Sequence, residues 1–260
     1  MNFLKKAFVF LSVLSLLTLS VLAHTLTTPY DWYFKKANDH SQPSIFLGNS
    51  FHEKYGTLYM GDKDEKVVYL TFDAGYGNPN LIKILDILKE KQVPGAFFIL
   101  PEVAEKHTEV AKRMSEEGHI VANHSYSHKD MTAITDREAF IKELTELEDL
   151  YADYTGYEMS KYFRPPSGRF SEQNLLYAYE AGYIPTFWSF AYQDWDNNKQ
   201  MPPDKAKKII LDNVHNGMVM LLHPNSETNS IILGEVIDEL KQQGYSFGTL
   251  DQLKETQKAR

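Results

Sequence analysis

The sequence predicts an α/β fold, a distorted (β/α) barrel of about seven parallel strands. Three observations support this prediction. From residue 67 onward, short apolar runs alternate with segments whose apolar residues recur at helical spacing. Strands that are each followed by a helix form a parallel sheet through right-handed crossovers, and this many units can close the sheet. Ionisable residues follow several of the strands, where the loops of such a barrel carry an active site.

The first strand is predicted over residues 67–72, and the apolar residues that follow recur at i, i+3, i+4 and i+7, which indicates a helix with one buried face. The second strand, residues 96–100, precedes a helix over residues 101–118 that begins at a proline and ends at a glycine. The third strand, residues 120–122, precedes a long helix that begins with a capping box at Thr135.

Four further units complete the pattern. Their strands are predicted over residues 162–163, 184–190, 218–222 and 245–249, and their helices over residues 171–182, 203–217, 230–244 and the C-terminal segment. In a closed barrel, the residues that follow each strand lie at one end of the sheet. We therefore expect the side chains after the strands to form a single site.

Composition excludes several classes of protein. With 43% hydrophobic and 24% charged residues, the chain is neither disordered nor a low-complexity filament. The absence of cysteine excludes a disulfide framework, a zinc ribbon, a cysteine nucleophile and a lipoprotein anchor, so a bound metal would need His, Asp or Glu ligands. A formal net charge of −8 argues against nucleic acid as a partner.

The N-terminal 64 residues divide into two parts. Residues 1–23 place two lysines before an apolar run and a small residue at Ala23, which is typical of an export signal cleaved after that residue. The run of about 16 residues is short for a membrane span, which needs roughly 20, and an uncleaved anchor is the alternative. Residues 24–64 are rich in aromatic and turn residues without clear periodicity. We expect them to form an arm packed on the main domain, residues 65–260.

His, Asp or Arg residues follow five of the seven predicted strands, namely Asp73, His124 with His128, Arg164, Asp194 and His223. The histidine pair has the most informative spacing, because two imidazoles four residues apart on a helical turn can bind one cation. Taken singly, each residue has a structural alternative, such as a turn cap for Asp73 or a packing role for His223. Their recurrence at strand ends favours an active site.

Five motifs of the polysaccharide deacetylases (NodB homology, carbohydrate esterase family 4) have counterparts here in the same order. They are Thr71-Phe72-Asp73, His124-Ser-Tyr-Ser-His128, Arg164-Pro-Pro-Ser-Gly168, Gln193-Asp194-Trp195 and Leu221-Leu222-His223. Through residues 30–36, 58–62, 72–78 and 187–195, the sequence further resembles the delta-lactam-biosynthetic de-N-acetylases of spore-forming bacteria. The resemblance implies a barrel enzyme that removes the N-acetyl group from a peptidoglycan sugar. The expected sugar is muramic acid of peptide-free spore cortex, on the way to muramic delta-lactam.

The resemblance also implies a role for each catalytic residue. Asp73 would be the general base that deprotonates water, and Arg164 would orient it. His223 would be the general acid that protonates the leaving amine, held and tuned by Asp194. Amide hydrolysis needs this division, because one group must take a proton while another returns it.

The implied cofactor is a divalent metal, expected to be zinc, with His124 and His128 as ligands. The usual motif has a second Asp directly after the base as a third ligand, and this sequence has Ala74 there. A methyl group cannot bind zinc. Water in the vacant position, another group such as Asn78, weak binding, or a reaction without a tightly held ion all remain open. We expect zinc to bind more weakly than in relatives with the full set.

The substrate-binding residues that the resemblance implies are Trp195, Tyr76, Asn78 and Ser167. The backbone N–H of Ser167 would help hold the oxyanion, a role that does not depend on the side chain. The implied partner is a peptidoglycan glycan strand, and the implied location is the cell wall or spore compartment of a Gram-positive bacterium.

Two other classes of protein are compatible with the same residues. A glycoside hydrolase could use Asp73 and Asp194 as its carboxylate pair, and it would release reducing ends instead of acetate. A catalytically inactive carbohydrate-binding relative would account for Ala74 and for the 13% aromatic content, since aromatic rings stack on sugars. It would bind glycan without turnover.

Overall fold

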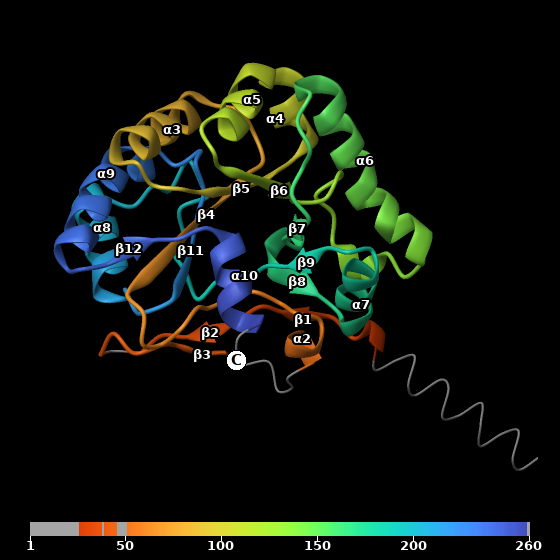
Figure 1. Ribbon diagram of the computed structural model, residues 1–260, viewed down its shortest axis with the longest axis horizontal. Helices are drawn as coiled ribbons and strands as arrows, with labels where there is room; N and C mark the ends of the chain where they lie inside the picture. The colour runs from red at the N-terminus through yellow and green to blue at the C-terminus, as the bar shows by residue number, and fades with distance from the viewer. Residues whose placement is uncertain (1–25, 38, 46–50, 259–260) are drawn as a thin grey trace, which may run out of the picture.

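The computed structural model describes residues 26–37, 39–45 and 51–258, so the predicted export signal lies outside the described residues (Figure 1). Its main sheet contains β4 (Val67–Ala74), β5 (Ala96–Ile99), β6 (Ile120–Asn123), β7 (Tyr162–Phe163), β9 (Ile184–Pro185), β10 (Phe190–Ala191), β11 (Met218–Leu222) and β12 (Ser246–Phe247). The strand order is β10-β11-β4-β5-β6-β7-β9, all parallel, and β12 pairs with β4. The predicted parallel barrel is confirmed.

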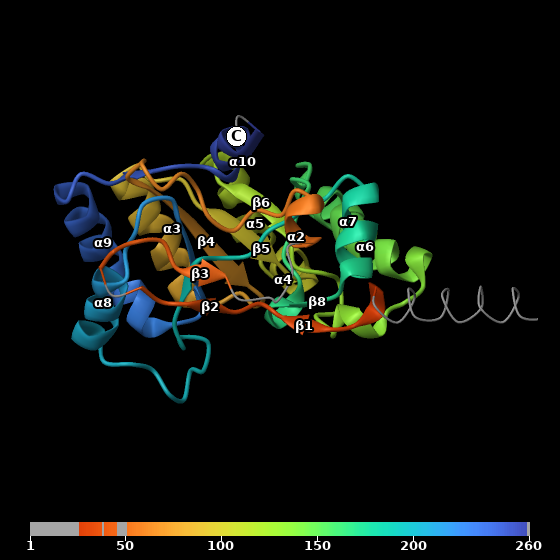
Figure 2. The ribbon, with the colours of Figure 1, turned by 90° about the horizontal axis from the view of Figure 1, so that it is seen from below.

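Helices surround the curled sheet (Figure 1). They are α3 (Pro79–Lys91), α4 (Pro101–Lys106), α5 (Thr108–Glu116), α6 (Arg137–Thr155), α7 (Glu172–Glu180), α8 (Pro203–Asp212) and α9 (Glu227–Gln242). The short helices η1 (Met131–Ala133) and η2 (Pro166–Gly168) lie in loops, and α10 (Leu250–Lys258) follows β12. In Figure 2, α10 lies at one end of the barrel and the loop between β10 and α8 lies at the opposite end.

Side chains along β4 point alternately to its two faces, and each face belongs to a different part of the apolar core. Val68, Leu70, Phe72 and Ala74 belong to an apolar cluster that includes residues of α3, α8 and α9. Tyr69 belongs to a second cluster, formed with residues of β5, β6 and α10. Successive side chains of a strand point to opposite faces. The odd-numbered residues of β4, which include Asp73, therefore face the inside of the barrel.

Four predicted boundaries are wrong. Residues 184–190 form two short strands instead of one, because β9 pairs with β7 at one edge while β10 pairs with β11 at the other. The predicted helix 101–118 is two helices, separated at His107, whose backbone is not helical (φ −132°, ψ 41°). Helix α6 is capped by Asp136 and not by Thr135, and α9 begins at Glu227 after Ser226. The two helix starts differ because Asp136 and Ser226 are the residues whose side chains accept the first backbone N–H groups of α6 and α9.

The N-terminal segment contacts both ends of the sheet: its first part lies against a loop at the carboxyl ends of the strands, and Nε2 of Gln42 donates to the carbonyl of Asn216, before β11, at 2.9 Å. Its strand β1 (Tyr30–Asp31) pairs with β8 (Arg169–Phe170), a pairing that the sequence did not predict. Between β1 and β2 (Phe34–Lys35), the ring of Trp32 stacks on Phe187 at 4.2 Å. The segment continues through β3 (Ser44–Ile45) and α2 (Phe51–Lys54). Across the described residues, none of the helices is both long and apolar enough to span a membrane.

Candidate active site

One pocket of about 960 Å³ gathers the residues that follow the strands. Its lining includes seven of the residues predicted from the sequence, namely Asp73, Tyr76, His124, His128, Ser167, Trp195 and His223. These residues come from the ends of β4, β6, β7, β10 and β11. The convergence follows from the parallel sheet, which places the carboxyl ends of its strands together.

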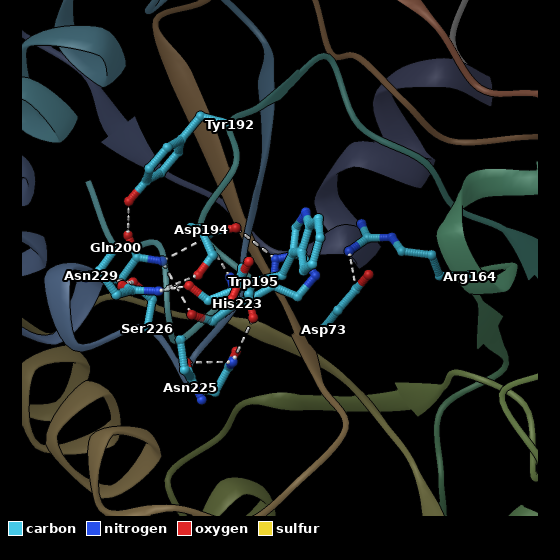
Figure 3. Close-up of polar contacts among 12 residues, drawn as sticks. Asp73, Arg164, Tyr192, Asp194, Trp195, Gln200, His223, Asn225, Ser226 and Asn229 are labelled. Atoms are coloured by element: carbon cyan, nitrogen blue, oxygen red, sulfur yellow. Dashed lines mark hydrogen bonds and ion pairs between the residues drawn. The ribbon is translucent and has the colours of Figure 1, made fainter.

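The Asp73 carboxylate is fixed by the buried guanidinium of Arg164, as Figure 3 shows. Nη1 of Arg164 donates to Oδ1 of Asp73 at 2.7 Å, and Nη2 donates to Oγ1 of Thr71 at 2.9 Å and to the carbonyl of Phe187 at 3.2 Å. The guanidinium also lies 4.1 Å above the ring of Phe98. These contacts hold Arg164 against the barrel interior and leave one side of Asp73 facing the pocket.

Asp73 is ionised at neutral pH. Burial alone would raise the pKa of its carboxyl, but the positive charge of Arg164, supported by His124 and His223, outweighs burial and lowers the pKa below its usual value of 3.8. The group can therefore accept a proton.

The imidazole of His124 is held in one orientation. Its Nδ1 lies 2.9 Å from the carbonyl oxygen of Arg164, and because a carbonyl only accepts, Nδ1 carries the proton. The other nitrogen, Nε2, lies 3.6 Å from Oδ2 of Asp73. Burial lowers the pKa of His124 to about 4. At neutral pH the ring is uncharged, with a free lone pair on Nε2.

His124 and His128 lie in a loop, so the prediction that they share a helical turn is wrong. Ser125 and His128 both have left-handed backbones, with φ of 68° and 54°. A left-handed backbone costs on the order of 1–2 kcal/mol for each such residue, and neighbouring contacts have to offset that cost. Here Oγ of Ser125 accepts the N–H of His128 at 3.0 Å, and Glu143 of α6 accepts both the N–H and the hydroxyl of Ser127. The chain doubles back, and the two imidazole rings lie 5.0 Å apart.

His223 is bound to Asp194 by two hydrogen bonds (Figure 3). Nδ1 lies 2.8 Å from Oδ1 of Asp194, and the backbone N–H of His223 donates to Oδ2 at 2.8 Å. Burial alone would lower the pKa of His223, but the hydrogen bond and charge of Asp194 outweigh it and raise the pKa above 6.5. His223 is thus suited to carry and deliver a proton.

The pocket wall offers two exposed aromatic rings. Trp195 is 57% exposed and Tyr76 is 61% exposed, so both are free to stack on a sugar ring. Ser167 also lines the pocket, with a left-handed backbone (φ 57°) in η2.

Comparison with known proteins agrees with this geometry. Residues 60–185 match the profile of the polysaccharide deacetylase family. The peptidoglycan-N-acetylmuramic acid deacetylase PdaA of Bacillus subtilis is 39% identical over 226 residues, 86% of this chain and 86% of PdaA. The chain belongs to the polysaccharide deacetylase family.

A solved structure of PdaA and one further relative support the assignment. The structure of Bacillus subtilis PdaA, a family 4 carbohydrate esterase, superposes with a TM-score of 0.83 at 38% identity, covering 87% of this chain and 97% of that one. A peptidoglycan-N-acetylglucosamine deacetylase of Bacillus cereus is 33% identical over 86% of this chain and 80% of its own.

In this polysaccharide deacetylase, Asn78 lies outside the pocket, contrary to prediction. Its Oδ1 accepts the backbone N–H groups of Asn80 at 2.9 Å and Leu81 at 3.1 Å, which caps α3. Ala74 is also turned away, since it is 1% exposed and packs in the helix-facing cluster. Neither position supplies the missing metal ligand.

The two histidines fit a divalent cation as a pair of neutral nitrogen ligands. The Arg164 carbonyl behind His124 is the kind of partner that orients a metal-binding imidazole. Among the described residues, no group of three or more His, Cys, Asp or Glu is arranged to hold a metal. The two histidines, whose rings lie 5.0 Å apart, are the residues that would hold an ion in this pocket.

Sequence reasoning missed the amides that support the acid. Nδ2 of Asn229, in the first turn of α9, donates to Oδ2 of Asp194 at 2.6 Å. Nε2 of Gln200 donates to the carbonyl oxygens of Asp194 at 3.0 Å and Asp196 at 2.9 Å, which secures the loop between β10 and α8. No spacing signal marks these residues, because an Asn near a helix start is ordinarily interpreted as a cap.

Proposed function

We propose that this protein is a peptidoglycan deacetylase that hydrolyses the acetamide of N-acetylmuramic acid, releasing acetate and a free amine. One observation carries the proposal, namely that an ionised Asp73 paired with Arg164 and a proton-carrying His223 paired with Asp194 lie in the same pocket. The names of the relatives, peptidoglycan deacetylases of muramic acid and of glucosamine, support the substrate class.

The reaction uses the two proton states in turn. Asp73 takes a proton from a water molecule while the oxygen of that water attacks the acetyl carbon. The backbone N–H of Ser167 stabilises the resulting oxyanion. His223 then gives its proton to the sugar nitrogen as the C–N bond breaks. A divalent ion, when held by His124 and His128, would polarise the carbonyl and acidify the water.

The alternative of a glycoside hydrolase is disfavoured by the burial of Asp194. The residue is 2% exposed, and both of its oxygens are occupied by His223, with Asn229 as a further donor. A second catalytic carboxylate has to reach the sugar, which Asp194 cannot do from this position. A binding-only role gives no reason for keeping both acid and base in place.

The decisive experiment measures acetate release from peptide-free peptidoglycan fragments, with and without a chelator. N-acetylglucosamine oligomers serve as the comparison substrate, since one relative is named for that sugar. We expect acetate from the muramic acid fragments. Release of reducing ends would indicate a glycoside hydrolase, and glycan binding without either product would indicate a binding protein.

We further propose that the protein is exported and acts on the spore cortex, as a step toward muramic delta-lactam. The apolar run and small residue at positions 1–23 support export. Fractionation of producing cells tests this, and activity found only in the cytoplasm would refute it.

A further inference from the structure

Two elements hold the carboxylate of Asp194. One is the end of β11, which carries His223, and the other is helix α9, which carries Asn229. While His223 binds both carboxylate oxygens, Nδ2 of Asn229 donates to Oδ2 at 2.6 Å and to the backbone carbonyl of His223 at 3.1 Å. Figure 3 shows Asn229 beside Asp194 on the side away from Asp73. One buried amide, 1% exposed, thus contacts both members of the acid pair.

The orientation of this amide is itself fixed. The hydroxyl of Tyr192 donates a hydrogen bond to Oδ1 of Asn229, which leaves the NH₂ group facing Asp194. Burial, together with the negative charge of Asp194, raises the pKa of Tyr192, so the phenol keeps its proton. Tyr192 lines the pocket. A continuous chain of hydrogen bonds therefore runs from the pocket wall through Asn229 to Asp194 and His223.

Helix capping does not require the Asn229 side chain. Helix α9 is capped by Ser226, whose Oγ accepts the backbone N–H of Asn229 at 3.1 Å. The amide is left for the carboxylate, and a buried carboxylate keeps a defined orientation only when its lone pairs are satisfied.

We propose that Asn229 is a positioning residue for the general acid, oriented by Tyr192. It holds Asp194 so that the carboxylate meets Nδ1 of His223 and turns Nε2 of the imidazole toward the substrate nitrogen. This inference rests on the proposed deacetylase function in one respect, namely that His223 delivers a proton to the substrate nitrogen.

Two substitutions at position 229 test the proposal. Asn229→Leu keeps the branched shape and removes the donor at every pH, so kcat is expected to fall about tenfold or more while KM stays within about twofold, because only proton delivery is affected. Asn229→Asp keeps the shape but places a second carboxyl against Asp194. Two adjacent carboxylates cannot both ionise freely, so a shared proton restores the donor as the pH falls.

The titratable groups that contact Asn229 are Asp194, His223 and Tyr192. We therefore expect the kcat of Asn229→Asp, relative to the parent at each pH, to rise from pH 8 to pH 5, whereas the relative kcat of Asn229→Leu stays flat. A residue that merely fills space would give the same pH-independent loss in both variants, and that result would overturn the proposal.

Tyr192→Phe provides a milder variant that keeps the ring at the pocket. Without the hydroxyl, the amide of Asn229 can turn over, so kcat is expected to fall with KM unchanged. Its matched control is Tyr151→Phe, which removes another buried hydroxyl, bonded to Ser115 at 2.7 Å and outside the pocket lining. Equal kcat in these two variants and the parent would contradict the orienting role of Tyr192.

Titration of the His223 imidazole by NMR separates this inference from the proposed function. If the parent releases no acetate, the proposed function fails, but a changed His223 titration in Asn229→Leu still supports the positioning role. An unchanged titration would overturn that role whether or not the parent is active. Circular dichroism of each variant confirms that the fold is retained.

Discussion

Ala74→Asp introduces a carboxylate at the position where the family motif led us to expect a metal ligand, and the structure predicts that it will destabilise the fold. Ala74 is 1% exposed and shares the helix-facing side of β4 with Leu70 and Phe72. Asp73 points to the opposite side, into the pocket. An Asp at position 74 would therefore lie among apolar side chains and not beside His124 and His128.

The expected loss of stability follows from the free energy needed to protonate a buried carboxyl, which stays neutral in the folded state. Binding a proton at pH 7 costs about 1.4 kcal/mol for each pH unit above the reference pKa of about 3.9, or about 4 kcal/mol. At this chain length, 1 kcal/mol shifts Tm by about 2–4 °C, so Tm should fall by about 8–16 °C. Because the carboxyl binds its proton more tightly in the folded state, the pH-dependent part of the loss vanishes below pH 4 and grows as the pH rises, and it adds to the cost of burying the neutral carboxyl.

Thermal unfolding at pH 5 and pH 7 in the presence of a chelator measures this effect. Ala74→Asn is the matched control, since it has the same shape without the charge and its loss should not depend on pH. Calorimetric titration with zinc then compares Ala74→Asp with the parent. Parent-like stability at pH 7, or tighter zinc binding in Ala74→Asp, would show that position 74 faces the histidines and that its assignment to the core is wrong.

Three further outcomes are expected. Asp73→Asn and His223→Ala should each lower acetate release by about 10²–10⁴-fold, and a near-normal rate in either variant would require its role to be reassigned. Asp194→Asn removes the charge that raises the pKa of His223, so the alkaline limb of the kcat/KM profile, where the acid loses its proton, should move to lower pH. An unchanged limb would show that Asp194 does not set the pKa of the general acid. Arg164→Met leaves Asp73 without its buried partner and should cost about 3–5 kcal/mol in urea unfolding, whereas a loss below 1 kcal/mol would contradict the pairing.

The fold was accessible from the sequence because its strands are short, apolar and buried on both faces. The runs that begin at Val67 and Met218 became β4 and β11 at nearly their predicted bounds. Residues 184–190 misled the prediction because burial continues through most of them while the hydrogen-bonding partner changes from β7 to β11. Hydropathy reports burial and carries no information about which neighbour a strand pairs with.

The site was predictable to the extent that it depends on strand ends. Asp73 lies at the carboxyl end of β4, His124 and His223 directly follow β6 and β11, and the parallel sheet alone brings the three together. The roles of Asn229 and Gln200 were not predictable, because the sequence does not reveal how the loop between β10 and α8 brings Asp194 beside the first turn of α9 and beside Gln200. The prediction for Asn78 failed for a related reason, since an Asn side chain can either bind a ligand or cap a helix. In the structure its Oδ1 caps α3.

The electrostatics of the site bear on whether the reaction can proceed without a metal. Arg164 keeps Asp73 ionised but also lowers its pKa, which makes it a weak base toward water, whose own pKa is 15.7. A base works best when its pKa lies near the operating pH, so Asp73 needs a more acidic water than bulk solvent supplies. A zinc ion held in a protein can lower the pKa of its bound water to about 7, and His124, whose neutral Nε2 lies 3.6 Å from Oδ2 of Asp73, would be one of the residues that hold such an ion. The charge balance thus favours a metal-assisted reaction even with two protein ligands, and the chelator arm of the acetate assay measures how far the rate depends on it.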